Sequence, residues 1–171
     1  PTSHEGSSDM PYAIPNRRVE LHATNEIVPI LWWRSVGHSI NGFVANSAID
    51  ELAALGGRDP VALRREMLAG KPRHLAVLET VVAESGYGTK ALPPGHAHGV
   101  ALQESFGSIV AQVAEVSVQG TDVRVHRVTC AVDCGLAVNP DQVVAQMQSA
   151  IAYGLTAALY GEITFEAGEP Q

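Results

Sequence analysis

The sequence predicts an α+β fold in which an antiparallel strand meander packs with several helices. Residues 39–55 carry apolar side chains three and four positions apart, which is the period of a helix. Valine-rich segments between residues 100 and 132 are separated by turn residues, as in neighbouring strands. The helical patterns come before and after these strands and not between them, so the strands are expected to pair with one another directly.

The first half of the chain is predicted to be helical. The helix over residues 39–55 ends at a pair of glycines, the usual helix terminators. Asp59 is a suitable cap and Pro60 a suitable first residue for a short second helix that ends near Gly70. A third helix begins at Pro72 and ends at the next Ser-Gly pair. The following residues, 87–97, have the composition of a loop.

Strand patterns occur at one place before these helices and at several after them. Within the last valine-rich segment the apolar alternation changes parity after Val125, which predicts a β-bulge. A turn is expected at residues 120–122. The predicted strands cover residues 18–24, 100–106, 109–118, 123–132 and 163–165.

A long helix is predicted from Pro140 to about Tyr160, with Asn139 as its N-cap. Three glutamines and the lack of a basic flank argue against a membrane span. A solvated helix face normally carries Lys and Glu. One stripe of this helix is instead polar and uncharged, so we expect it to lie against backbone groups or a polar ligand. Its members are Gln142, Gln146, Ser149 and Tyr153.

The composition sets further limits. The chain has 171 residues, of which 46% are hydrophobic and 17% charged, as in a globular protein. Its formal net charge is -7 with scattered basic residues, which argues against a nucleic-acid partner. No targeting segment is visible. We expect residues 1–10 to be a loose segment and residues 11–171 to be part of one domain of a longer protein.

Arg34 is the only formal charge between residues 27 and 49, and it follows Trp32 and Trp33. An arginine stays in apolar surroundings only when its guanidinium is paired. The residues alone leave two interpretations open, a buried salt bridge or a contact to a polar ligand. Gln146 likewise has two possible interpretations, an ordinary buried amide or a contact to a ligand.

A zinc site is the remaining chemical possibility. His96, His98, Cys130 and Cys134 are the side chains that suggest it. The H-x-H and C-x3-C spacings fit no common ligand pattern, so no metal site is predicted. Reduced thiols are favoured over a strained local disulfide between the two cysteines.

The two unusual polar positions lie in segments that resemble a known family. Residues 31–68, LWWRSVGHSINGFVANSAIDELAALGGRDPVALRREML, resemble the stretch of molybdenum hydroxylase large subunits that carries a cofactor-contacting arginine. The segment WRSVGHSINGF is most similar to the isoquinoline 1-oxidoreductase and aldehyde dehydrogenase branch of the family. It departs from the corresponding segment of the xanthine dehydrogenases. Residues 132–165, which begin VDCGLAVNPDQVVAQ, resemble the family segment D-x-G-x-x-(I/V)-N-P and the helix after it, whose glutamine touches the pterin.

The resemblance implies that the chain is part of a larger molybdopterin-binding subunit. The implied cofactor is molybdopterin with molybdenum, often extended in bacteria to a cytosine dinucleotide. Arg34 would contact this cofactor and Gln146 would hydrogen-bond to it. The implied reaction hydroxylates an aldehyde or an N-heteroaromatic carbon, with water as the oxygen source. Electrons would pass to a [2Fe-2S] subunit and, in this branch, often to a c-type cytochrome.

The resemblance also implies what the chain lacks. The catalytic base of the family is a glutamate in a G-x-G-E-P-like segment, which we expect beyond Gln171; the GEP at residues 168–170 matches a variable turn instead. Glycine-rich segments on the other side of the cofactor are expected before Pro1. We therefore expect no catalytic residue in this chain and no activity from it without the remaining segments of the same subunit. The alternative is a non-catalytic accessory or interaction domain that keeps the fold without the cofactor.

Overall fold

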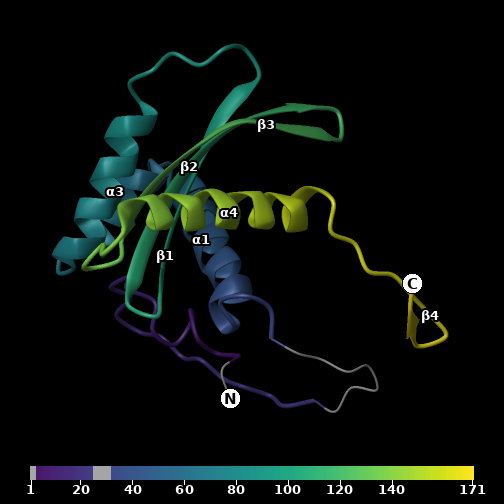
Figure 1. The fold of residues 1–171 in the computed structure, drawn as a ribbon. Coiled ribbons are helices and arrows are strands. Elements are labelled where there is room, and N and C mark those ends of the chain that lie inside the picture. Colours follow the sequence, from purple (N-terminus) through teal and green to yellow (C-terminus); the bar gives the residue numbers. More distant parts are fainter. Residues whose placement is uncertain (1–2, 25–31) are drawn as a thin grey trace. The chain divides into compact units, whose positions relative to one another are not determined.

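The computed structural model describes residues 3–24 and 32–171. Contacts divide the chain into two compact units, the first made of Pro1–Leu21 with Trp32–Gly135 and the second of His22–Leu31 with Leu136–Gln171. The described helices are α1 (Gly37–Leu55), α2 (Pro60–Met67) and α3 (Pro72–Ser85) in the first unit and α4 (Pro140–Leu159) in the second (Figure 1). The strands are β1 (His96–Ser105), β2 (Ser108–Gln119), β3 (Asp122–Asp133), β4 (Phe165–Glu166) and β5 (Glu169–Pro170). The predicted α+β class is confirmed.

The three helices of the first unit begin and end where local signals place them. The Oδ1 atom of Asp59 accepts a hydrogen bond from the backbone N–H of Ala62 at 2.7 Å, so Asp59 caps α2 as predicted. α3 ends at Gly86, whose φ of 73° is left-handed and favours glycine. α1 begins two residues before the predicted start and ends at the predicted residue, before Gly56. The predicted helices are confirmed.

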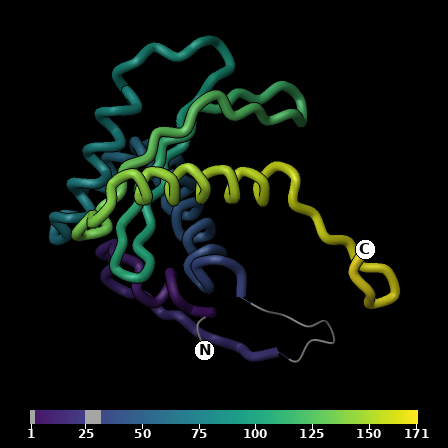
Figure 2. The backbone as a smooth tube through the Cα atoms, viewed as in Figure 1, coloured from purple at the N-terminus to yellow at the C-terminus, as the bar shows by residue number. Residues whose placement is uncertain are grey.

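The sheet of the first unit is an antiparallel meander in the order β1-β2-β3 (Figure 2). Glu115 pairs with Arg127, whereas the next residue, Val116, pairs with Val125. His126 is therefore the extra residue of a β-bulge, at the position where the change of parity predicted one. β1 begins at His96, so the predicted loop ends two residues early.

One predicted strand is wrong and another is shifted. Residues 18–24 form neither helix nor strand, and all of them are exposed. Alternating apolar residues indicate a strand only where one face is covered and a partner strand pairs the backbone, and this segment has neither within the described residues. In the second unit, β4 overlaps the predicted strand over 163–165 only at Phe165, and it forms a hairpin with β5.

The core of the first unit lies on one face of the sheet. α3 packs on β2 and β3, α1 packs on β1, and α2 packs on α1. The strand residues of this core are opposite one another, as in the pairs of Val100 with Val113 and of Leu102 with Ala111. Burying each such aliphatic side chain contributes about 1.5–3 kcal/mol. The core residues are Tyr12, Ile49, Val61, Leu68, Val77, Leu78, Val81, Val100, Leu102, Ile109, Ala111 and Val113.

α4, in the second unit, has the predicted cap and no buried residue. The side-chain oxygen of Asn139 accepts hydrogen bonds from the N–H groups of Asp141 and Gln142. Five apolar residues of α4 are half-buried: Val143, Met147, Ala150, Ile151 and Leu155. The polar stripe of Gln142, Gln146, Ser149 and Tyr153 is exposed. Over the described ranges, no helix is long and apolar enough to cross a membrane.

Candidate functional site

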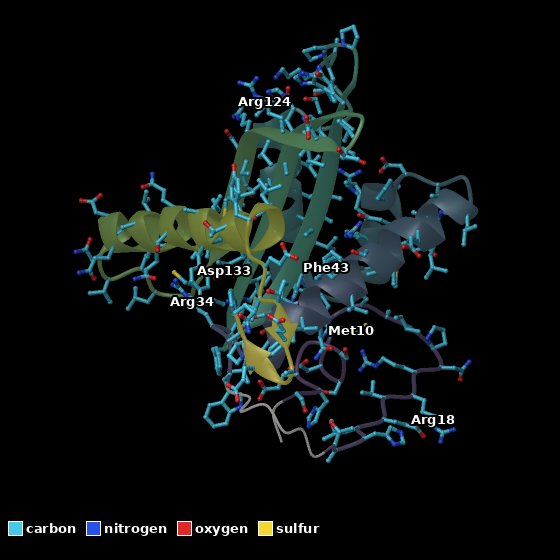
Figure 3. All side chains as sticks on the ribbon, turned by 90° about the vertical axis from the view of Figure 1, so that its right-hand side faces the viewer. Met10, Arg18, Arg34, Phe43, Arg124 and Asp133 are labelled. Atoms are coloured by element: carbon cyan, nitrogen blue, oxygen red, sulfur yellow. The ribbon has the colours of Figure 1, made fainter. Side chains whose placement is uncertain are left out.

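Arg34 lies in a strained turn immediately before α1 (Figure 3). The side chain is exposed, and the two residues that follow it, Ser35 and Val36, have φ angles of 67° and 54°. Non-glycine residues rarely adopt these left-handed angles, and a β-branched residue such as valine does so at a cost. Such angles persist only where surrounding contacts impose them, and they cluster at functional sites. The backbone before α1 is therefore held in one particular conformation, and Arg34 projects from it.

Hydrogen bonds within the turn and to the start of α1 close this turn. The hydroxyl of Ser39, in the first turn of α1, donates to the carbonyl oxygen of Arg34. The backbone N–H of Val36 donates to the carbonyl of Trp33 at 2.9 Å. The main chain of Arg34 is therefore fixed by a hydrogen bond to the first turn of α1.

The buried arginine of this fold is Arg64, on α2, and not Arg34. Arg64 is fully buried, and its Nη1 atom forms an ion pair with Oδ1 of Asp50 on α1. Its Nη2 atom donates to the carbonyl of Asn46 at 3.1 Å. A buried guanidinium needs such partners because an unpaired charge is costly in the interior. Sequence reasoning missed this pair, although it lies within residues 31–68, the first of the two segments that resemble the family.

Asn46 joins α1 to the outer edge of the sheet. Its Oδ1 atom accepts from the N–H of Leu102 at 3.0 Å, and its Nδ2 atom donates to the carbonyl of the same residue at 3.0 Å. The Asn46 amide thus pairs the backbone of β1 at this residue as a neighbouring strand would. Tyr12 also donates its hydroxyl to Asn46 Oδ1, at 3.3 Å, and burial raises the pKa of Tyr12. No local pattern in the sequence marked this residue.

Gln146 is exposed on α4, one turn after the polar stripe begins. Arg34 and Gln146 lie in different units, whose placement relative to each other is not determined. That their side chains converge on one pocket therefore stays a prediction. Each of them is nevertheless accessible on its own unit, as a contact to a ligand requires.

The D-x-G segment between β3 and α4 is anchored at its first residue. Arg73, near the start of α3, binds Asp133 with two N–H groups, at 2.8 and 2.9 Å. Asp133 also accepts from the N–H of Gly135 at 2.9 Å. The Arg73 guanidinium, followed by the Gly135 N–H, lowers the pKa of Asp133 to about 2. This carboxylate therefore fixes the exit of β3.

A separate polar cluster lies on β1, β2 and β3, outside the apolar core. The Nδ1 atom of His96 lies 2.8 Å from Glu115, and this contact, with that of Lys90, lowers the pKa of Glu115. The His96 and His126 rings stack with centroids 4.1 Å apart. These two rings help to line an open pocket of about 360 Å³, which includes neither Arg34 nor Gln146.

The side chains of the zinc interpretation are not brought together as a metal site. Cys130 and Cys134 are free, and burial raises the pKa of the Cys130 thiol. His98 lies 4.0 Å from Glu115 and stacks on Tyr87. Within residues 3–24 and 32–171, no group of three or more His, Cys, Asp or Glu side chains is arranged to hold a metal ion.

Comparison with known proteins finds relatives that are oxidoreductase subunits or dehydrogenases by name. The chain is 32% identical, over 92% of its length, to the beta subunit of isoquinoline 1-oxidoreductase from Brevundimonas diminuta. It is 27% identical over 91% of its length to a nicotinate dehydrogenase subunit of Pseudomonas putida. It is 28% identical over 81% of its length to a membrane-bound aldehyde dehydrogenase (pyrroloquinoline-quinone) of Gluconacetobacter polyoxogenes. No solved structure matches the chain.

Residues 70–171 match the model of the molybdopterin cofactor-binding domain. The chain therefore belongs to this molybdopterin-binding family, as the resemblance implied. It spans only 21%, 15% and 21% of the length of the three relatives. Arg34 precedes the matched segment and Gln146 lies within it.

The exposed side chains suit a molybdopterin. Arg34 offers five N–H donors and no acceptor, whereas the Gln146 amide offers both donors and an acceptor. A pyranopterin with its phosphate presents acceptors and donors along a flat edge, which such groups can pair. The one carboxylate on α4 is that of Asp141, in its first turn. The rest of the helix, residues 142–159, contains no charged side chain that would repel a phosphate near Gln146. The donor set therefore fits the cofactor.

Proposed function

We propose that this chain is part of the molybdopterin-binding subunit of a molybdenum-dependent oxidoreductase, with Arg34 and Gln146 as contacts to the cofactor. The substrate is an aldehyde or an N-heteroaromatic compound, which is hydroxylated with oxygen from water. Electrons leave through a [2Fe-2S] partner subunit and from there to a c-type cytochrome. The names of the three relatives, which refer to isoquinoline, nicotinate and aldehyde, support this substrate class.

The observation that carries the proposal is the exposed residue Arg34 on a strained turn, in a chain of the molybdopterin-binding family. When bound, molybdopterin with molybdenum supplies the redox chemistry, and the protein supplies binding, orientation and electrostatics. The role of Arg34 is to donate hydrogen bonds to the phosphate or pterin edge and to fix its orientation. Gln146 donates to or accepts from the pterin without adding charge.

The experiment compares the cofactor content of the whole enzyme with Arg34→Ala and with Gln146→Ala. Loss of a hydrogen bond to a charged group costs about 1.5–3 kcal/mol, so Arg34→Ala should weaken retention about 10- to 150-fold. Gln146→Ala removes a neutral hydrogen bond, which costs about 0.5–1.5 kcal/mol. Molybdenum is measured by elemental analysis and pterin by fluorescence after oxidation, both per folded subunit.

Matched controls are available for both positions. Arg124→Ala removes an exposed arginine from β3, and Gln148→Ala removes an exposed glutamine from another face of α4. Both should retain wild-type cofactor content. If Arg34→Ala lowers only thermal stability, and molybdenum per folded subunit is unchanged, Arg34 does not contact the cofactor.

The rival function is a non-catalytic accessory domain that keeps the fold. A native enzyme without stoichiometric molybdenum and pterin would favour this rival. Because one relative is named as a pyrroloquinoline-quinone enzyme, the same preparation should be assayed for quinone. Quinone in place of pterin would refute the proposed cofactor.

A further inference from the structure

We propose that His38 and Gln103 are positioning residues: their hydrogen bond fixes the strained turn before α1 and so sets the direction in which Arg34 presents its guanidinium. This inference rests on the proposed function, because it concerns how Arg34 is held for the cofactor. Neither residue touches the cofactor in this account.

His38 lies in the first turn of α1, four residues after Arg34, and only 8% of it is exposed. Its Nδ1 atom lies 3.1 Å from the Nε2 atom of Gln103 on β1. The Gln103 amide nitrogen can only donate, so Nδ1 of His38 is the acceptor and its proton is on Nε2. That Nε2 faces Asp9 at 3.8 Å, which favours the same tautomer. The imidazole is thus oriented from both sides.

Gln103 is itself held against α1. Its Nε2 atom also donates to the backbone carbonyl of Glu104, at 3.1 Å. A Cβ atom placed on Gly42, one turn further along α1, would lie 3.2 Å from Oε1 of Gln103. α1 and the Gln103 side chain therefore approach so closely that a residue larger than glycine at position 42 would displace this amide.

The N-terminal segment closes the other side of the same helical turn. The Nδ2 atom of Asn41 donates to the carbonyls of Ser3 and Glu5, at 2.8 and 2.7 Å. A Cβ atom on Gly6 would lie 3.1 Å from Cα of His38. The first turn of α1 is therefore packed between residues 3–9 and Gln103.

This packing explains how the unfavourable angles of Ser35 and Val36 are maintained. Left-handed angles at non-glycine residues are unfavourable and persist only where the surroundings impose them. The backbone N–H of His38 donates to the carbonyl of Ser35 at 3.1 Å, so fixing His38 fixes the turn directly. When the His38 side chain loses its partner, the turn can relax, and the guanidinium of Arg34 is then presented over a wider range of directions.

The test uses the whole enzyme with the single substitutions Gln103→Leu and His38→Leu. Each removes the hydrogen bond between His38 and Gln103 and leaves a side chain of comparable size in its place. Loss of one neutral hydrogen bond predicts about a two- to tenfold loss of molybdenum and pterin per folded subunit. His38→Asn places an amide oxygen where Nδ1 was and should restore the content. Gln112→Leu is the matched control on β2 and should retain full content, since the Gln112 side chain hydrogen-bonds to Cys130 on β3 and not to His38.

The decisive readout is the double variant with Arg34→Ala. If Gln103 acts through Arg34, Gln103→Leu lowers cofactor content in the wild-type background and has no further effect in Arg34→Ala. A full additional loss in the double variant would overturn the inference, as would wild-type content in both single leucine variants. Hydrogen exchange over residues 33–39 should rise in Gln103→Leu and return to normal in His38→Asn.

The exchange measurement separates the two proposals. If Arg34→Ala retains its cofactor while exchange over residues 33–39 rises in Gln103→Leu, the cofactor role of Arg34 fails but the positioning of the turn stands. If exchange does not change in Gln103→Leu, the positioning role is refuted whatever the cofactor content.

Discussion

Replacing Asn46 by alanine should loosen the outer edge of the sheet. The Asn46 amide pairs both the N–H and the carbonyl of Leu102, and only 1% of Leu102 is exposed. A buried polar group that loses its partner costs about 1–3 kcal/mol, so two such backbone groups cost about 2–6 kcal/mol. Tyr12 and Arg64 lose an acceptor as well, although Arg64 keeps the carbonyls of Pro60 and residue 46 and the Asp50 carboxylate.

The assay is native-state hydrogen exchange on the whole subunit, followed for the peptide that covers β1. Each 1.4 kcal/mol corresponds to a factor of ten, so even the lower end of the range predicts about 30-fold faster exchange of the Leu102 amide. Asn46→Asp keeps the shape and the accepting oxygen but loses the donor to the Leu102 carbonyl, and it should give an intermediate rate.

Asn41→Ala is the control for this prediction. Asn41 is the same residue type on the same helix, and its amide donates to the carbonyls of Ser3 and Glu5 in the N-terminal segment and not to β1 within the described residues. Its replacement should leave exchange in β1 unchanged. If the Leu102 amide exchanges within threefold of the wild-type rate in Asn46→Ala, the Asn46 amide does not close the edge and the reasoning is wrong.

Two further predictions concern the anchor after β3 and the strained turn. Asp133 has a pKa lowered to about 2 beside Arg73, so its contribution to stability is complete above pH 4 and is lost as the pH falls from about 4 to 2. Urea denaturation should therefore find Asp133→Asn less stable than wild type at pH 7 and equal to it near pH 2; a difference that is independent of pH would contradict the anchor. Val36→Gly should stabilise the chain by about 1 kcal/mol in the same assay, since relief of a left-handed φ outweighs the entropy cost of glycine, whereas the neighbouring Ile40→Gly within α1 should destabilise it.

Local signals in the sequence were enough to predict most elements of the fold. Asp59 and Asn139 cap their helices through atoms two or three residues away, and glycine ends α3, so these boundaries depend on neighbours in the chain. The bulge at His126 was predictable for the same reason, because a change of parity is itself a local pattern.

What the sequence did not predict depends on contacts between distant residues. Arg34 has fewer charged neighbours in the chain than Arg64, yet Arg64 is the buried one because α1 and α2 pack around it. Residues 18–24 alternate like a strand, but alternation cannot supply a partner strand. Five apolar residues of α4 are half-buried while the polar stripe with Gln146 is exposed, which composition alone did not distinguish. The convergence of Arg34 and Gln146 stays a prediction.

The pairing of Leu102 by Asn46 also bears on which strands can join this sheet. An incoming strand at the β1 edge would have to displace the amide at Leu102, and with it the bonds that Asn46 makes to Tyr12 and Arg64. A variant that frees the N–H and carbonyl of Leu102 would therefore expose a template for strand addition at the β1 edge, whether in assembly or in aggregation.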